Sequence, residues 1–352
     1  MAAPGLVRRY GDHLLRCVGR AVSRSAGIDY RWRSWMERLV FSRCQVVHDL
    51  PPIFHYWSNR YVRPKLEALG VADPDQFFLR HLERCYDAAE GQRRFVSIGA
   101  GSCDLEMRLA IALRASGRDR FVIDGLDLNR SLIAHAVERV GAAGLTAHVR
   151  PQVCDLKAWN PTTAYDAAIA NHSLHHLVAL EHVFDHIART LPPHGRFIVS
   201  DMIGRNGHMR WPEALTIVNE YWEELPASYR YDRQRFLQLD RFENWDCAKE
   251  GFEGIRAQDI LPLLVERFSF DVFLAFANVI DPFVERSFGP NFSVDREWDC
   301  AFIDRVHARD EQELAAGRIK PTHMFAVMGN GPSVAALCVG GVAPAAAVRR
   351  PH

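Results

Sequence analysis

Hydrophobic and polar positions alternate in blocks through the middle of the chain, and the blocks predict strands separated by helices. Short apolar runs lie at 94–101, 120–128, 148–156, 164–173 and 195–204. Longer stretches with apolar positions three or four residues apart lie between them, at 104–117, 129–144 and 177–191. Strands that alternate with helices of this length predict a doubly wound, mostly parallel sheet with helices on both faces.

This alternation stops on both sides of the central block. Residues 1–90 read as an aromatic-rich helical extension, and 205–262 as a helical lid inserted after the fifth strand. The strand pattern resumes at 270–280 and 321–329. The main domain is therefore expected over 91–330. Residues 331–352 are rich in Ala, Val, Gly and Pro and read as a disordered tail.

Composition excludes several classes of protein. The chain has 352 residues, of which 48% are hydrophobic, and 43 Lys and Arg balance 43 Asp and Glu. This indicates a globular protein, and the zero net charge argues against a nucleic-acid partner. The eight Cys form no CxxC pair, and no apolar run reaches the ~18 residues of a membrane span. We therefore expect a cytoplasmic protein without a membrane partner.

The first candidate for chemistry is the glycine turn in VSIGAGSCDLE. Gly99 and Gly101 allow close approach of the backbone to a ligand, and the following helix offers free N–H groups. A dinucleotide fingerprint needs a third glycine at position 104. Asp104 stands there, and its carboxylate would meet a pyrophosphate, so a ligand without phosphates suits this turn better.

Two acids follow at the ends of the next strands. Asp127, in GLDLN, could accept hydrogen bonds from both hydroxyls of a ribose. Asp155, in QVCDL, could accept from an exocyclic amine such as that of adenine. Each could also be an ordinary capping or loop acid.

Histidines gather after the fourth strand, where six of the 16 lie between 172 and 194. Helical geometry sends His182 and His186 to the solvent side, opposite an apolar face. His172, His175 and His176 lie at the strand end and are candidate general bases. They lack a Cys or carboxylate partner at a metal-ligand spacing, so no metal is predicted.

Together these features resemble the class I S-adenosylmethionine-dependent methyltransferases, in motif detail over 95–205 and in the order of elements to about 330. The resemblance implies a Rossmann-like, seven-stranded sheet with an antiparallel edge hairpin at 270–280 and 321–329. Two positions depart from the family pattern: Ser97 stands where an acid is frequent, and Cys103 replaces the usual third glycine. The positions that the resemblance assigns to the cofactor are Ser97, Gly99, Ala100, Gly101, Asp127, Leu128, Asp155, Leu156 and Asn171.

The resemblance also implies a reaction, transfer of a methyl group from S-adenosylmethionine to a small or medium organic acceptor, at oxygen. His175 is the preferred base, with His172 and His176 as alternatives. The beginning of the lid is expected to line the acceptor pocket, with Asp201, Arg205, Tyr221 and Trp222. Arg60 or Arg63 could close over the cofactor carboxylate, and the first 90 residues could form a homodimer contact.

Other functions stay open from the sequence. Because Ser97 and Cys103 depart from the family pattern, the chain could instead be a non-catalytic subunit that binds S-adenosylmethionine for regulation. A nicotinamide-dependent oxidoreductase and another chemistry on the same cofactor are further alternatives.

Overall fold

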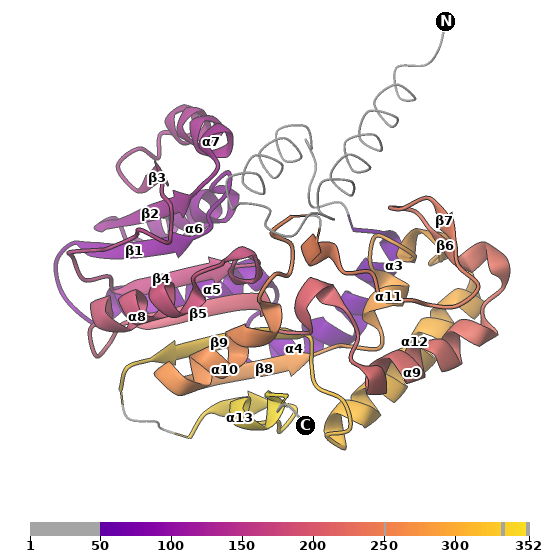
Figure 1. Cartoon of the computed structure of the whole chain (residues 1–352). Coiled ribbons are helices and arrows are strands. Elements are labelled where there is room, and N and C mark those ends of the chain that lie inside the picture. Colours follow the sequence, from indigo (N-terminus) through magenta and orange to yellow (C-terminus); the bar gives the residue numbers. More distant parts are fainter. Residues whose placement is uncertain (1–49, 250, 332–334, 350–352) are drawn as a thin grey trace, which may run out of the picture.

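The computed structural model describes residues 50–249, 251–331 and 335–349. Its centre is an eight-stranded sheet in the order β10-β8-β9-β5-β4-β1-β2-β3 (Figure 1). All neighbouring strands run parallel except β9, which is antiparallel to β5 and β8. The strands are β1 (Arg93–Ile98), β2 (Phe121–Asp127), β3 (Val149–Val153), β4 (Ala167–Asn171), β5 (Arg196–Met202), β8 (Ser269–Phe276), β9 (His323–Gly329) and β10 (Leu337–Val339).

Helices cover both faces of this sheet. On one face lie α5 (Pro74–Asp87), α6 (Asp104–Ala115) and α7 (Arg130–Ala142), and on the other lie α8 (Leu180–Thr190) and α10 (Ala257–Arg267). Side chains of β1 alternate between the two cores: Phe95 packs in the first, and Val96 and Ile98 pack in the second. Burial on both faces explains why the strands read as nearly continuous apolar runs.

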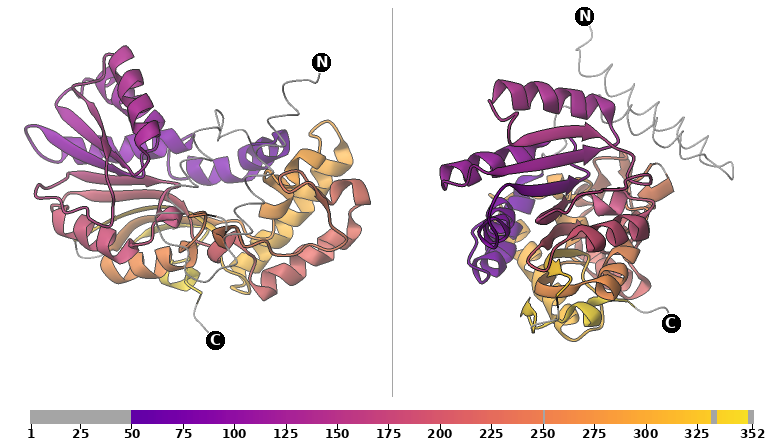
Figure 2. Two further views of the ribbon diagram at one scale, coloured as in Figure 1. Left: turned by 45° about the horizontal axis from the view of Figure 1, so that its top comes forward. Right: turned by 90° about the vertical axis from the view of Figure 1, so that its left-hand side faces the viewer.

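A second group of helices stands beyond the carboxyl ends of the parallel strands (Figure 2). It contains α3 (Pro52–Trp57), a π-helical turn (Ser58–Val62), α4 (Arg63–Glu67), α9 (Pro212–Glu224), α11 (Asp281–Val284) and α12 (Glu297–Ala315). The predicted all-helical lid at 205–262 is corrected in part, because it also holds the hairpin β6 (Tyr231–Asp232) and β7 (Leu237–Gln238). Residues 1–49 of the predicted helical extension lie outside the described residues.

The end of the chain differs from its prediction. The sheet has eight strands rather than seven, because β10 pairs in parallel with β8. A short helix, α13 (Pro344–Ala347), follows and buries Ala347. The expectation of a disordered tail is therefore wrong for 335–349: β8 presents an open edge, and its unpaired backbone groups are satisfied by this added strand.

Within the described ranges, no helix combines the length and the apolar character that a membrane crossing requires.

Candidate active site

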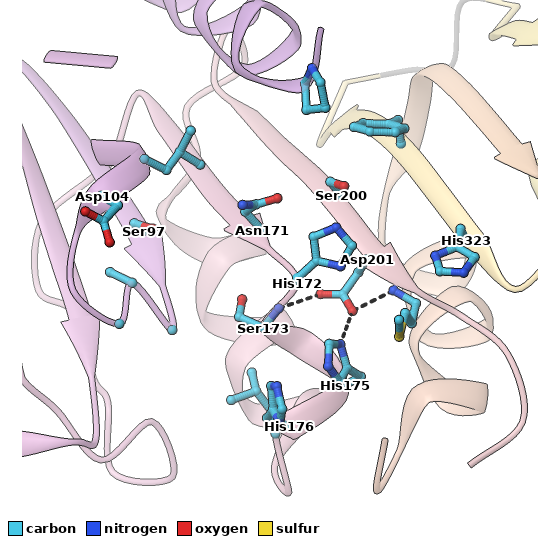
Figure 3. A pocket seen from close by; sticks show the side chains of 18 of the residues that line it. Ser97, Asp104, Asn171, His172, Ser173, His175, His176, Ser200, Asp201 and His323 are labelled. Carbon is cyan, nitrogen blue, oxygen red and sulfur yellow. Dashed lines mark hydrogen bonds and ion pairs between the residues drawn. The ribbon is translucent and has the colours of Figure 1, made fainter. Parts of the chain in front are cut away.

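A cleft of about 1200 Å³ opens at the carboxyl ends of β1, β2, β4 and β5. The turn after β1 lines one end, and the segment after β4 lines the other (Figure 3). Helices α3 and α4 contribute Phe54, Trp57 and Arg63 to its wall, whereas Arg60 does not line it. The cleft therefore lies where ligands bind in open parallel sheets.

The glycine turn after β1 is built by close contacts. Gly99 has a φ of +69°, and a Cβ there would lie 2.6 Å from the Cβ of Ser173. Gly101 has a φ of +53°, and its N–H donates to Oδ2 of Asp127 at 2.9 Å. Both positions need a left-handed backbone, which glycine adopts without strain. The turn thus presents its backbone to the cleft and is tied to the end of β2.

Cys103, at the position of the missing third glycine, also adopts the left-handed region, with a φ of +56°. Its side chain is fully buried. The thiol fills the space over Gly125 of β2, where a Cβ would lie 2.7 Å from Sγ. The glycine absent from the loop is thus matched by a glycine in the neighbouring strand, which makes room for the larger residue.

Replacing Gly125 by Ala should lower the free energy of unfolding by about 1–3 kcal/mol, because the new methyl group overpacks the thiol. The double variant with Cys103→Gly should recover most of that loss. Denaturant unfolding of the two single variants and the double variant measures the coupling. Additive effects would contradict the contact.

The carboxylate of Asp127 lines the cleft and is bonded to the backbone after β1 and after β2. Its Oδ1 accepts the N–H of Asn129 at 2.7 Å, opposite the bond from Gly101. Burial raises the pKa of Asp127, although both backbone donors act to lower it. Asp155 and Leu156 line the same cleft, as do Leu128 and Asn171. The structure therefore brings the predicted cofactor residues into one cleft.

Ser97 meets an acid that sequence reasoning did not single out. Its hydroxyl donates to Oε1 of Glu106, from the first turn of α6, at 2.5 Å. Both residues are buried and line the cleft. The second oxygen, Oε2, is buried and has no hydrogen-bond partner. Burial, more than the neighbouring charge of Asp104, raises the pKa of Glu106 to about 7. A carboxyl group thus reaches the loop from the helix rather than from the strand.

The three candidate histidines differ in their surroundings (Figure 3). His172, with a φ of +50°, is exposed in the cleft. His175 is buried, and its Nδ1 lies 2.6 Å from Oδ1 of Asp201, while Nε2 lies 3.3 Å from Oε1 of Glu253. Because carboxylates only accept, both nitrogens of His175 carry protons. Burial alone would lower its pKa, but these carboxylates raise it to about 10. The structure therefore argues against His175 as the base.

Asp201 lines the cleft, as predicted, but its carboxylate is bonded to the surrounding protein. It is 1% exposed, and besides His175 it accepts the N–H groups of Ser173, Leu174 and Met202 at 2.8–2.9 Å. It holds the backbone after β4 and orients His175. Burial acts to raise its pKa, but the charge and hydrogen bond of His175 hold it at about 2.

The other predicted acceptor residues do not line the cleft. Trp222 is fully buried and packs its ring against Phe288, with centroids 4.8 Å apart. Tyr221 donates to the carbonyl of Arg305, and Arg205 to that of Arg210. These three predictions are corrected, because α9 turns Trp222 and Tyr221 into the first core and Arg205 is held by a backbone carbonyl. His186 is buried beside Trp159 rather than exposed to solvent, because the loop after β3 covers that side of α8.

Besides Glu106, sequence reasoning missed Glu253 and its pairing with His208. Glu253 comes from the loop before α10, and His208 from the turn after β5 (Asn206–His208). They meet at 2.7 Å. No local spacing in the sequence connects either residue to the histidines after β4.

Residues 72–256, more than half of the chain, match a family model described as a methyltransferase domain. The chain belongs to this methyltransferase family. It is a class I enzyme, and S-adenosylmethionine is its cofactor. The nicotinamide and purely regulatory alternatives are thereby set aside.

Several solved structures are similar to this methyltransferase at low sequence identity. Geranyl diphosphate C-methyltransferase from Streptomyces coelicolor is 14% identical, with 85% of this chain and 98% of that chain covered and a TM-score of 0.45. The [4+2]-cyclase SpnF is 17% identical, with 74% of this chain and 82% of that chain covered and a TM-score of 0.39. The StiE O-MT is 15% identical, with 81% of this chain and 83% of that chain covered and a TM-score of 0.41. A comparison with curated proteins finds no match.

Proposed function

We propose that this methyltransferase transfers the methyl group of S-adenosylmethionine to an oxygen atom of a small or medium organic molecule. The observation that carries the proposal is the continuous cleft of about 1200 Å³ from the glycine turn to the histidines after β4. Pockets for one ligand usually measure about 300–1000 Å³. The larger volume supports simultaneous binding of a cofactor and an acceptor.

The residues at the first end fit the cofactor. S-adenosylmethionine supplies a methyl group activated by a sulfonium, and it carries ribose hydroxyls and an amino acid portion. Asp127 would accept hydrogen bonds from the ribose, since each carboxylate oxygen has a second lone pair. The unpartnered Oε2 of Glu106 would accept from the ammonium group, which removes the cost of its burial. Arg63 lines the cleft and is a candidate for the carboxylate.

Replacing Glu106 by Gln should weaken binding of S-adenosylmethionine about ten- to a hundredfold, because a hydrogen bond to a charged group is lost. With a pKa of about 7, Glu106 is ionised above neutral pH, and only this form attracts the cation. Affinity should therefore rise about tenfold between pH 6 and pH 8, in step with the ionised fraction. Calorimetric titration at several pH values measures both effects.

Asp104→Asn is the matched control, because this neighbouring acid is already bonded to Ser102 and Arg139. Its effect on cofactor affinity should be small, and the pH dependence should persist. Arg108 also faces Glu106 and favours its ionised form. Unchanged affinity and pH dependence in Glu106→Gln would show that the ammonium binds elsewhere.

The second end of the cleft suits an organic acceptor. Phe54, Trp57, Phe252, Phe276 and Phe325 line it beside His172. These rings would exclude water from the methyl group and position the nucleophile in line with the breaking bond. His172 is the proposed base, because it is the exposed one of the three imidazoles and can reach a hydroxyl in the cleft.

Replacing His172 by Asn should lower the rate of methyl transfer about 10²- to 10⁴-fold, the usual contribution of a general base. Asn tolerates the left-handed backbone at this position. The full chain is incubated with methyl-labelled S-adenosylmethionine and a small-molecule extract, and mass spectrometry identifies molecules that gain one methyl group. His182→Asn, on α8 outside the cleft, is the control. Methylation only at carbon, or of nucleic acid, would contradict the proposal.

The cytoplasmic location and a homodimer contact through the first 90 residues stay parts of this proposal. Size-exclusion chromatography with light scattering tests the second.

A further inference from the structure

A cluster of imidazole and carboxylate groups lies at the acceptor end of the cleft. Oε1 of Glu253 is 2.7 Å from Nε2 of His208 and 3.3 Å from Nε2 of His175. Oε2 of the same carboxylate is 3.8 Å from Nε2 of His176. One ligand atom from each of His175, His208 and Glu253 lies within 4.8 Å of the other two. Three donor atoms thus converge on one point.

Their spacing suits a metal ion. Ligands at 2.0–2.2 Å from a tetrahedral ion lie roughly 3.3–3.5 Å from one another. The pair of His175 and Glu253 already has this distance, and the pair of His208 and Glu253 would open by less than about 1 Å. Glu253 has a half-exposed side chain on a loop and can make this adjustment.

The hydrogen bond between Nδ1 of His175 and Asp201 has the arrangement found around metal-bound histidines. The Nδ1–H group donates to Asp201 at 2.6 Å, so Nε2 is directed at the convergence point. A ligating histidine almost always donates its other ring N–H to a carboxylate or carbonyl, which fixes its orientation. Asp201 is in turn held by three backbone N–H groups. The imidazole is therefore rigidly aimed.

The loops that carry the other two groups are joined to each other. The N–H of Gly207 donates to the carbonyl of Gly254 at 2.9 Å. A Cβ at Gly254 would lie 3.1 Å from Nε2 of His208, and a Cβ at Gly207 would meet Asp246. The absence of a side chain at Gly254 thus leaves room for the ring of His208 beside Glu253.

We propose that His175, His208 and Glu253 bind one divalent transition-metal ion such as Zn²⁺. Imidazole and carboxylate donors in this ratio suit zinc and its first-row neighbours rather than Mg²⁺. The ion takes the place of the proton on Nε2 of His175, while the Nδ1 proton stays with Asp201. His176 lies beside it, with its ring centroid 4.1 Å from that of His175. His175 and Glu253 also line the cleft, so an ion bound to them would be within reach of an acceptor.

A second cluster in the described residues shows why the first is the better site. Asp281, Glu285 and His323 also converge. There Nη1 of Arg210 lies 2.5 Å from Oδ2 of Asp281, and Thr322 donates to the same oxygen at 2.7 Å. A guanidinium already neutralises that carboxylate. Among the residues that the structure describes, no Arg or Lys forms an ion pair with Glu253.

The ion gives the cleft a Lewis acid next to His172. An oxygen atom of the acceptor that binds to it would lose its proton more easily and be held in place for the transfer. This role rests on the proposed oxygen acceptor, whereas the metal site itself rests only on the three side chains. Binding is therefore measured without any acceptor.

The test uses the untagged full chain, stripped with a chelator and titrated with Zn²⁺ by calorimetry and with Co²⁺ by visible absorption. We expect one ion per chain and the intense absorption of a low-coordinate Co²⁺ site. Affinity should fall on the order of 100-fold or more in Glu253→Gln and in His208→Asn, since loss of a supporting group alone costs about 10–100-fold. His194→Asn is the matched control, because that imidazole pairs with Asp166 outside the cleft.

Each result decides the proposal. Circular dichroism checks that the variants are folded, and the half-exposed Glu253 makes its substitution the safer of the two. No saturable binding to the wild-type chain would overturn the site. Equal binding to wild type, Glu253→Gln and His208→Asn would also overturn it. Loss of binding in His323→Asn but not in His208→Asn would assign the ion to the second cluster. Methyl transfer that persists after chelation would reject the Lewis-acid role alone.

Discussion

Replacing Gly99 by Ala should be among the most damaging single changes in this methyltransferase. The new Cβ would lie 2.6 Å from the Cβ of Ser173, and the residue would have to keep a φ of +69°. The left-handed backbone costs about 1–2 kcal/mol for a residue other than glycine, and overpacking costs about 1–3 kcal/mol more. We expect the free energy of unfolding to fall by about 2–5 kcal/mol, with cofactor binding lost in parallel.

Gly101→Ala separates the two causes. Gly101 has a similar φ, +53°, but a Cβ there meets nothing within 4 Å. Only the backbone cost of about 1–2 kcal/mol should appear. Denaturant unfolding of the cofactor-free chain compares both variants with wild type. Equal losses would mean that the contact with Ser173 relaxes at no cost.

Replacing Asp201 by Asn should lower the free energy of unfolding by about 3–5 kcal/mol. It should also misplace the side chains at the acceptor end of the cleft. Asp201 accepts four hydrogen bonds, from the backbone of Ser173, Leu174 and Met202 and from His175. An amide has a single acceptor oxygen, so at least one N–H donor would face the NH₂ group. The imidazolium of His175 would also lose its main counter-charge. Methyl transfer should fall at least about 100-fold, even at temperatures where the variant is folded.

Asp232→Asn is the matched control for this change. Asp232 is equally buried and accepts the N–H groups of Gln234 and Arg235 and the guanidinium of Arg235. It does not line the cleft. Its substitution should destabilise the chain while the folded fraction keeps its activity. Thermal unfolding and initial rates at a fixed low temperature distinguish the effects, and similar rate losses in both variants would contradict a positioning role for Asp201.

Local features were predicted well where one short segment contains both the signal and the structure. The strand ends at Gly99 and Asp127 follow from an apolar run, a turn residue and a helix start. The antiparallel hairpin of β8 and β9 was also expected, and it is present. Trp222 shows the limit, because an aromatic residue after the fifth strand fits a lid or a core equally well. Only the packing of α9 against Phe283 and Phe288 decides for the core.

The candidate site shows the same limit in its chemistry. His175 was selected as a base because of its place after β4, but its partners Asp201 and Glu253 come from later segments. These two carboxylates balance the charge of the protonated His175 ring from both sides. An imidazole held with both protons is not a general base. The missing acid at Ser97 also looked like a weakness in the cofactor loop. Glu106 reaches the same place because the turn folds α6 back over β1.

Periodicity and turn residues were enough to predict the parallel sheet, the glycine turn and the polar groups at the carboxyl ends of the strands. Hydrophobic periodicity and turn residues act over a few neighbours, so they can be recognised without coordinates. The tertiary structure alone decided which groups face each other: Cys103 with Gly125, Ser97 with Glu106, and His175 with Glu253 and His208. Hydrogen bonds and metal coordination act over about 2–3 Å, and such contacts depend on how distant segments pack.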